Sequence, residues 1–290
     1  MIQPMLTIRS DRDRRDLCPG ALRPWPAEDG LLVRLRIPGG IVTSDQLESL
    51  LDAAEQFGDS RVRVTVRSNL QVRAFPGENG QLAPDALAAL LATGLVPVPS
   101  HDLVRNIMVS PQTGIAGGRA DLRSVVDELD KRLCSSAVFA DIPGRFLFAL
   151  DDGRGDLMDR QCDLGLAALD AETAQLRIGD SWGSIVDLGD AAQALAELAE
   201  KFLTARGTGP SVPWHVEELD SKLAETQAPD PRLPAASEPL AFGLVPGGRH
   251  VEVPPDGLGR SHIEDLIAGA NYVIVTRWNG IFIPEGQFVD

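Results

Sequence analysis

The chain has 290 residues, 43% of them hydrophobic and 24% charged, which is typical of globular protein with two or three domains. Its net charge of −15 disfavours nucleic acid as a partner, since a long polyanion would be repelled. No uncharged apolar run approaches the length of a membrane span, and the first 16 residues contain acids but no apolar stretch. We therefore expect no membrane contact, no leader peptide and a cytoplasmic location.

The charges are unevenly distributed along the chain. Residues 1–75 contain 11 arginines and 10 acidic residues, whereas the remainder holds 16 basic and 32 acidic residues. Arginine outnumbers lysine 24 to 3. Base composition of the gene is the simpler explanation of that ratio. The clustering of arginines near the N-terminus needs another, because arginine binds carboxylates and phosphates through two parallel hydrogen bonds.

The first predicted unit is strand, helix, strand. Residues 31–40 alternate apolar and basic residues, residues 43–58 have leucines at helical spacing, and residues 61–73 alternate again. Thr43 and Gln46 suit a capping box, and Gly58 suits a helix end. We expect one strand, or two short strands in line, over 61–73. The predicted polar face carries Arg34, Arg36, Arg61, Arg63, Arg67 and Arg73.

A second region follows a proline-rich stretch at 84–99. Its pattern predicts an α+β domain with elements in this order: a strand at 105–109, a glycine-rich turn, a helix at 121–134, strands at 145–151, 164–169, 174–178 and 184–188, and a helix at 191–205. The proline-rich segment from 226 has the composition of a linker.

The last segment resembles the first. Residues 250–284 again predict strand, helix, strand, and Leu47, Leu50 and Leu51 match Ile263, Leu266 and Ile267 at an offset of 216 residues. At an offset of 210, the stretch 67–69 matches 277–279. A diverged duplication is the economical explanation, with coincidence as the alternative.

An arginine-lined face predicts an anion, because like charges at strand spacing repel each other. Nucleic acid is disfavoured because neither strand has aromatic residues on its polar face for base stacking. A nucleotide has little support, since the glycine-rich stretches match no phosphate-binding motif. A compact ligand with several carboxylates fits better. An interface with the acidic later region is the competing interpretation.

Other candidate chemistry is weaker. The histidines at 101, 215, 250 and 262 have no metal-ligand spacing, and no nucleophile triad follows from residue order. The three cysteines, Cys18, Cys134 and Cys162, form neither a disulfide framework nor a metal motif. We expect no metal site from these residues and can name no catalytic residue.

Five stretches in the same order carry a resemblance that covers nearly the whole chain: CPGALRPW, DGLLVRLRIPGG, RSNLQ, VRNIMVSP and IPGRF. Together they resemble the nitrite and sulfite reductase superfamily, and within it most closely the precorrin-3B synthases of cobalamin biosynthesis. The resemblance implies an α+β fold in which two ferredoxin-like half-domains, related by a pseudo-twofold repeat, flank a larger α+β domain. The implied units are residues 1–99, 100–225, a linker at 226–236, and 237–290.

The family implies a function and cofactors. Its reductases bind sirohaem and a [4Fe–4S] cluster, and its precorrin-3B synthases oxidise precorrin-3A, a tetrapyrrole rich in carboxylates. The alternatives are a non-catalytic tetrapyrrole- or partner-binding paralogue and a sirohaem-dependent sulfite or nitrite reductase. By matching motif, the implied tetrapyrrole-binding residues are Arg34, Arg36, Arg67, Asn69, Gln71, Arg105, Asn106 and Arg145.

Two departures from the family pattern bear on these expectations. Arg145 stands at the first of two family lysines, but the second position is Leu147. The family's cluster cysteines, spaced C-x₅-C and C-x₃-C, have no match, and the sequence stops where the family's second large domain begins. We expect a separate chain to supply that domain, or self-association, or a protein that works without the cluster.

Overall fold

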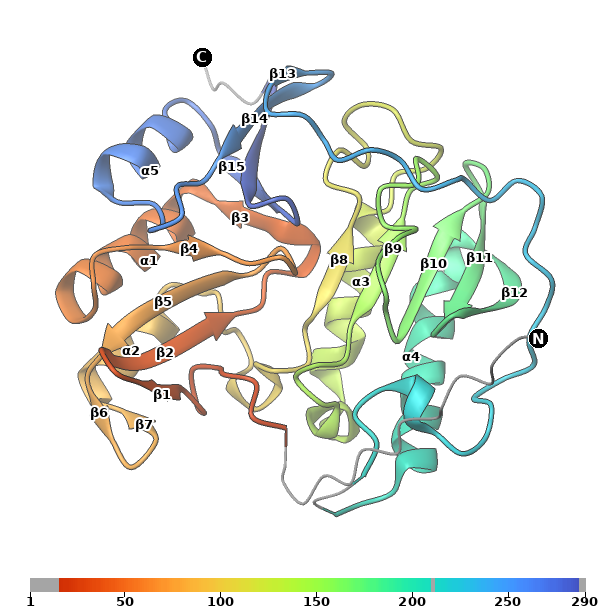
Figure 1. The fold of residues 1–290 in the computed structure, drawn as a ribbon, viewed down its shortest axis with the longest axis horizontal. Helices are drawn as coiled ribbons and strands as arrows, with labels where there is room; N and C mark the ends of the chain where they lie inside the picture. Colours follow the sequence, from red (N-terminus) through yellow and green to blue (C-terminus); the bar gives the residue numbers. More distant parts are fainter. Residues whose placement is uncertain (1–15, 210–211, 287–290) are drawn as a thin grey trace, which may run out of the picture.

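The structure is a computed structural model that describes residues 16–209 and 212–286, so the leader expectation concerns residues that lie almost wholly outside it. The fold is mixed α and β, with three larger sheets and a small hairpin (Figure 1). Two of these sheets belong to the ferredoxin-like half-domains and one to the central domain. None of the helices in the described ranges combines the length and apolar character needed to cross a membrane.

The first half-domain is a four-stranded sheet in the order β1-β2-β5-β4, covered by one long helix. Its elements are β1 (Trp25–Ala27), β2 (Gly30–Leu35), α1 (Ser44–Phe57), β4 (Arg63–Val64) and β5 (Leu70–Phe75). The predicted capping box is present: Gln46 N donates to Thr43 Oγ1, and Thr43 N donates to Gln46 Oε1, both at 3.2 Å. Gly58 caps the other end, as predicted.

The predicted continuous strand over 61–73 is wrong. β4 and β5 are antiparallel, with Arg63 opposite Gln71 and Val64 opposite Leu70. A tight turn reverses the chain between them: Thr65 N donates to Asn69 O at 2.9 Å, and Ser68 has a φ of 54°. The alternation of residues continues through the turn, so periodicity alone did not reveal it. The turn moves Arg67 from a strand face to a hairpin tip.

The second half-domain repeats the first in the same strand order, β13-β14-β16-β15, which confirms the pseudo-twofold repeat. Its elements are β13 (Gly243–Val245), β14 (Gly248–Glu252), α5 (Arg260–Ile267), β15 (Tyr272–Thr276) and β16 (Gly280–Pro284). Asn279, with a φ of 56°, takes the place of Ser68 in the equivalent turn. The two turns therefore match with an offset one residue larger than the predicted 210, which equates Arg67 with Trp278.

The two half-domains exchange strands and share one core. β3 (Ile41–Thr43) follows β2 of the first half-domain in sequence but pairs with β15 of the second. Conversely, Leu258 of the second half-domain forms a bridge with Val62 of the first. Buried residues from both halves, among them Leu47, Leu50 and Ile263, form a single apolar cluster. Because that core is continuous, the half-domains hold the hairpin tips at a fixed spacing.

The first half-domain ends in a short hairpin and a helix that lead to the central domain: β6 (Gly77–Glu78), β7 (Gln81–Leu82) and α2 (Pro84–Ala92). The central sheet has the order β12-β11-β10-β9-β8, with β8, β9 and β10 parallel and the last two strands antiparallel. Its strands are β8 (Ile107–Val109), β9 (Phe148–Asp151), β10 (Leu164–Ala168), β11 (Thr173–Ile178) and β12 (Ser181–Asp187).

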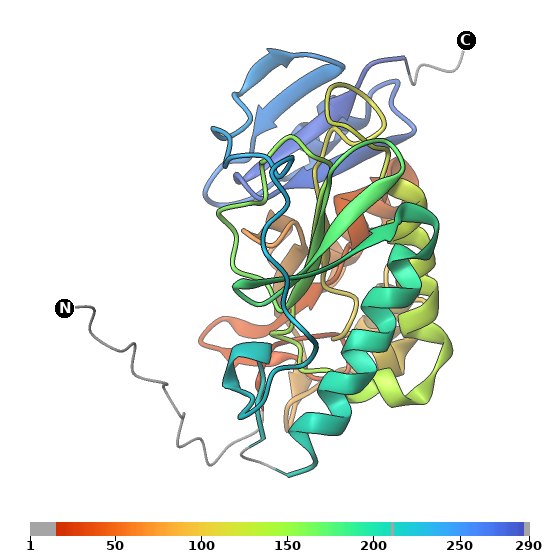
Figure 2. The ribbon, with the colours of Figure 1, turned by 90° about the vertical axis from the view of Figure 1, so that its right-hand side faces the viewer.

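Two helices, α3 (Arg123–Ser135) and α4 (Leu188–Arg206), cover one face of the central sheet (Figure 2). Between helices and sheet lies a second core that includes Phe146, Phe148 and Phe202. The segment predicted as a linker runs along this domain to β13 (Figure 1). Hydrogen bonds hold it there, from Asp230 N to Gln175 Oε1 at 2.8 Å and from Ser237 N to Gly155 O at 3.0 Å.

Candidate functional site: an arginine cluster between the hairpin tip and the central sheet

A pair of buried asparagines joins the first half-domain to the central domain. Asn69 Nδ2 donates to Asn106 Oδ1 at 2.8 Å, and Asn69 Oδ1 accepts from Ile37 N at 2.9 Å. Asn106 Nδ2 donates in turn to Phe146 O at 3.0 Å. Both amides are therefore satisfied by protein partners. Their role in the structure is to fix the β4–β5 turn against the start of β9, which positions Arg67.

The CPGA stretch and Arg36 form a second junction. Arg36, 2% exposed, donates through Nη1 to Pro19 O and to Arg34 O. Ala21 N donates to Asp102 Oδ2 at 2.6 Å. Burial raises the pKa of the Asp102 carboxyl, and the nearby Arg36 opposes that rise. The predicted ligand residue Arg36 is thus an interior residue that ties the N-terminal segment to β2.

Arg105 also has internal partners. Its Nε and Nη2 donate to both carboxylate oxygens of Asp130 at 2.7 and 2.6 Å, and its Nη1 donates to Leu95 O. This bidentate pair connects the end of the first half-domain to α3. Arg105 and Arg36 were both predicted to contact a tetrapyrrole, but the structure commits their guanidinium groups to protein oxygens.

Three other arginines of the predicted polar face pair with acids. Arg61 lies 3.4 Å from Asp256, Arg63 lies 2.6 Å from Asp59, and Arg73 lies 3.1 Å from Asp29. The expectation of one common arginine face is therefore wrong, because the β4–β5 turn redistributes these side chains and acids neutralise them.

Four other arginines lie near one another, and we call them the arginine cluster: Arg34, Arg67, Arg145 and Arg160. Arg34 Nη2 donates to Gln71 Oε1 at 3.2 Å, and Arg67 Nη1 donates to Arg145 O at 2.7 Å. Within the described ranges, Arg34, Arg67 and Arg160 form no ion pair, and the Nε atoms of Arg34 and Arg160 are buried without a hydrogen bond. Arg145 forms an ion pair with Asp16, whose Oδ1 lies 3.5 Å from Nε.

The pKa values of three cluster arginines are lowered by burial and by neighbouring cations. Burial lowers the pKa of Arg34, and Arg145 lowers it further. Burial likewise lowers the pKa of Arg67, followed by the effect of Arg160, and burial lowers the pKa of Arg160, followed by that of Arg277. Partly desolvated cations that repel one another are stabilised by an anion. The cluster is a candidate site for a ligand with more than one negative group.

The second half-domain does not repeat this chemistry. Strand pairing equates Arg34 with His250 and Gln71 with Phe282. His250 is buried, stacks with Phe242 at 4.6 Å and hydrogen-bonds Thr276 Oγ1 at 2.9 Å. The pseudo-twofold repeat is thus broken at this pair of positions: Arg34 and Gln71 in the first half-domain correspond to His250 and Phe282 in the second.

Gly144 permits the close approach that shapes one edge of the cluster. A Cβ there would lie 2.8 Å from Cys18 Cβ and 3.3 Å from Asp16 Oδ2, the atom that accepts from Arg145 N. We expect Gly144→Ala to destabilise the protein by about 1–3 kcal/mol, because the N-terminal segment must shift. Gly189→Ala is the control: no atom lies within 4 Å, and alanine is the better helix former, so stability rises slightly. Urea unfolding measures both, and equal effects would contradict the packing argument.

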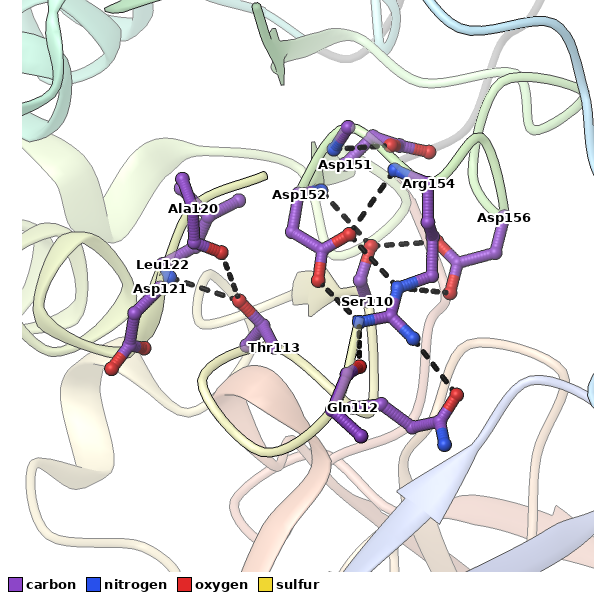
Figure 3. Close-up of polar contacts among 12 residues, drawn as sticks. Ser110, Gln112, Thr113, Ala120, Asp121, Leu122, Asp151, Asp152, Arg154 and Asp156 are labelled. Carbon is purple, nitrogen blue, oxygen red and sulfur yellow. Dashed lines mark hydrogen bonds and ion pairs between the residues drawn. The ribbon is translucent and has the colours of Figure 1, made fainter. Parts of the chain in front are cut away.

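A buried acidic network lies at the carboxyl ends of β8 and β9 (Figure 3). Arg154 donates to both carboxylate oxygens of Asp152, at 2.9 and 2.6 Å, and to Gln112 Oε1 at 2.8 Å. Asp151 accepts three backbone N–H groups, and Ser110 Oγ donates to Asp156 Oδ1 at 2.6 Å. Burial, and then the charge of Asp151, raise the pKa of Asp156 to about 7.

The raised pKa of Asp156 makes stability depend on pH. The folded protein binds a proton that the unfolded chain releases near pH 4, so stability should fall as pH rises from about 4 to about 7. Asp156→Asn mimics the protonated acid. The parent chain should lose free energy of unfolding between pH 5 and pH 8, and we expect this loss to be about 1–3 kcal/mol smaller in the variant. Urea unfolding at both pH values measures the difference. A variant with the same pH dependence as the parent would contradict the assignment.

The cysteines do not assemble a cluster site. Cys18 lies in the N-terminal segment, Cys134 on α3 and Cys162 before β10, and all three are unpaired. Burial raises the pKa of each thiol, to about 12 for Cys162, which disfavours the thiolate that binds iron. In the part of the chain that the structure describes, no group of three or more His, Cys, Asp or Glu residues could hold a metal ion.

Sequence reasoning missed two members of the site's surroundings. Arg160 lies in the loop after β9, and Trp214 lies under Arg145, whose guanidinium carbon is 5.4 Å from the ring centroid. Neither belongs to a periodic pattern or to one of the five stretches. The sequence showed only their residue types: Trp214 is one of few tryptophans, and Arg160 lies in a region rich in acidic residues.

Comparisons with known proteins found one matching half-domain, several similar sequences and a similar structure. Residues 25–91 match the model of the nitrite/sulfite reductase ferredoxin-like half domain. Similar curated proteins are a ferredoxin–nitrite reductase of Synechococcus elongatus, 37% identical over 42% of this chain and 25% of its own length, and one of Leptolyngbya laminosa, 32% identical over 49% and 28%. A precorrin-3B synthase of Sinorhizobium is 32% identical over 48% and 29%.

The NirA protein of Mycobacterium tuberculosis has a similar structure, with a TM-score of 0.64 at 16% identity over 92% of this chain and 57% of that one. The aligned stretches thus span between a quarter and three fifths of these proteins. Two independent findings agree, the matched half-domain and the fold of the whole described chain. Residues 25–91 match a nitrite/sulfite reductase ferredoxin-like half-domain, and the chain shares its fold with NirA.

Proposed function

We propose that this chain binds a carboxylate-rich tetrapyrrole at the arginine cluster and acts as a precorrin-3B-synthase-like protein. The observation that carries the proposal is the set of half-buried arginines, Arg34, Arg67 and Arg160, that have no ion-pair partner among the described residues. Acids neutralise the neighbouring arginines of the same half-domain. An arrangement that leaves these cations unpaired is suited to a ligand that brings its own anions.

The spread of the cations favours a large ligand over a small one. Arg34 comes from β2, Arg67 from the hairpin tip, Arg145 from the segment before β9 and Arg160 from the loop after it. Nitrite or sulfite alone would engage one or two guanidinium groups. Several carboxylates around a rigid macrocycle would reach all four elements, and each could accept two parallel hydrogen bonds from an arginine.

The residues fit a tetrapyrrole but not an iron–sulfur cluster. Arg34 and Arg160 are half-buried and have no ion pair among the described residues, so their guanidinium groups can donate to carboxylates. The three cysteines lie in separate parts of the described chain and do not form a set of thiolate ligands for a cluster. A bound tetrapyrrole would be the substrate in the precorrin-3B synthase case, and this chain's own residues would bind it, orient it and offset its charge.

Sirohaem-dependent nitrite or sulfite reduction is the second candidate, because two of the similar curated proteins are ferredoxin–nitrite reductases. One position favours the first candidate. Leu147, where a second lysine is expected from the family, is 1% exposed in a small apolar cluster with Met108, Ala149 and Leu157. A site with one cation fewer is less suited to a small anionic substrate and remains compatible with an organic ring.

The proposal includes a partner. The chain covers only part of the length of its relatives, and exposed apolar side chains lie in β13, Leu244 at 85%, and directly before it, Phe242 at 45%. We propose that a further domain or chain, or a second copy of this one, covers this edge. Sedimentation over the micromolar range should show self-association, which Leu244→Lys weakens. A concentration-independent monomer would oppose self-association.

An absorbance titration tests ligand binding. An octacarboxylate porphyrin should bind saturably at one site per chain, and its neutral octamethyl ester should not. Nitrite consumption and oxygen-dependent conversion of precorrin-3A, assayed on the same preparation, distinguish the two candidate activities. Equal binding of acid and ester would show that carboxylates are not recognised and would refute the proposal.

A further inference from the structure

A histidine held by a buried carboxylate borders the arginine cluster. The Asp163 side chain is 4% exposed and accepts three donors: Leu147 N at 2.8 Å, Val216 N at 3.0 Å and His215 Nδ1 at 3.1 Å. The His215 side chain is 35% exposed. Because Nδ1 faces this carboxylate, Nε2 is the ring nitrogen that remains available to another molecule. Nε2 has no hydrogen bond to any residue that the structure describes.

Two neighbours of this imidazole, Trp214 and Asp163, lie beside the arginine cluster. Trp214, its neighbour in sequence, lies under the Arg145 guanidinium at 5.4 Å, and Asp163 is close enough to Arg67 to act on its charge. His215 is thus joined through Asp163 and Trp214 to the elements that carry Arg67 and Arg145. Asp163 faces the ring directly, and the charged residues on the surrounding elements are Arg145, Arg67, Glu217, Glu218 and Asp180.

The imidazole is not needed to anchor its own segment. The Asp163 carboxylate already accepts Val216 N and Leu147 N, and Glu218 accepts Trp214 N at 2.8 Å. Removing the ring leaves these backbone hydrogen bonds in place. A partly exposed histidine oriented by a buried acid, with its second nitrogen directed away from that acid, suits contact with a bound molecule.

We propose that His215, oriented by Asp163, contacts the ligand of the arginine cluster through Nε2 and takes up a proton when a polycarboxylate binds there. This inference rests on the proposed function and adds to it a residue outside the five family-like stretches. A carboxylate placed beside the ring favours the imidazolium form. Binding should therefore take up as much as about one proton per ligand near neutral pH and should weaken as pH rises from 6 to 8.

The test is calorimetric titration with the octacarboxylate porphyrin in two buffers of different ionisation enthalpy, which gives the number of protons taken up. In His215→Asn the amide retains a donor for Asp163 but lacks Nε2. We expect this variant to lose the proton uptake and to bind about three- to tenfold more weakly at pH 6. His262→Asn, at an exposed position on α5, is the matched control and should behave as the parent chain does.

The outcomes separate this inference from the proposed function. If the parent chain binds the porphyrin and His215→Asn retains the same proton uptake and affinity, His215 does not contact the ligand and the inference is wrong. If the parent chain does not bind the porphyrin at all, the proposed function fails and the inference fails with it. Urea unfolding shows that His215→Asn is folded, since its stability should lie within about 1 kcal/mol of the parent.

Discussion

Replacing Arg34 and Arg67 together by alanine should weaken binding of an octacarboxylate porphyrin by about 100-fold or more. Each guanidinium can form charge-assisted hydrogen bonds to a ligand carboxylate, and each such interaction contributes roughly 1.5–3 kcal/mol. Neither side chain has an acid partner in the described ranges, so the loss falls on ligand binding more than on folding. Absorbance titration at low ionic strength measures the effect, which added salt should reduce.

The matched control removes two arginines that lie outside the arginine cluster, one from each half-domain. In Arg73→Ala/Arg249→Ala the net charge changes equally, but Arg73 is a surface residue paired with Asp29 and Arg249 is exposed on β14. This control should bind within about threefold of the parent chain, since only distant, screened charges are lost. Equal losses in both double variants would mean that binding follows net charge and not the cluster.

Replacing Arg36 by methionine should cost about 3–5 kcal/mol of stability. The guanidinium is 2% exposed and donates to two backbone carbonyls, and it is the cation that most favours ionised Asp102. Its removal leaves Pro19 O without this donor and Asp102 without its nearest counter-charge in the interior. Urea unfolding at pH 7 should show a lower midpoint with an unchanged slope.

Arg249→Met is the control for this prediction, since the same substitution at an exposed position should change stability by less than about 0.5 kcal/mol. The same pair of variants distinguishes a structural from a ligand-binding role for Arg36. If Arg36→Met is as stable as the parent but no longer binds the porphyrin, then Arg36 is a ligand residue, as its motif first suggested.

Much of the fold could be predicted from the sequence. The helix of each half-domain, the capping box at Thr43 and the order of strands and helices in the central domain follow from periodicity and cap residues, whereas the half-domains themselves were implied by the family resemblance. The turn at 65–69 could not be predicted, because it contains neither glycine nor proline and the alternation of residues runs through it. That one turn decides which arginines share a surface.

The candidate site was predicted only in part. Motifs singled out Arg34, Arg67 and Arg145, but they also included Arg36, which holds the N-terminal segment, and Arg105, Asn69 and Asn106, which form contacts between domains. Sequence patterns cannot distinguish an arginine that pairs with groups inside the protein from an arginine whose guanidinium is free to contact a ligand. The difference lies in which acids and carbonyls are nearby in space, as Asp130 is for Arg105 and no acid is for Arg34 among the described residues.

The crystal structure of the chain with an octacarboxylate porphyrin bound is the most direct test of the central claim. The account predicts the macrocycle beside the β4–β5 hairpin tip, with its carboxylates within hydrogen-bond distance of Arg34, Arg67 and Arg160. A porphyrin bound elsewhere, for example in the roughly 270 Å³ cavity between α4 and β12, with the arginine cluster unchanged, would contradict it.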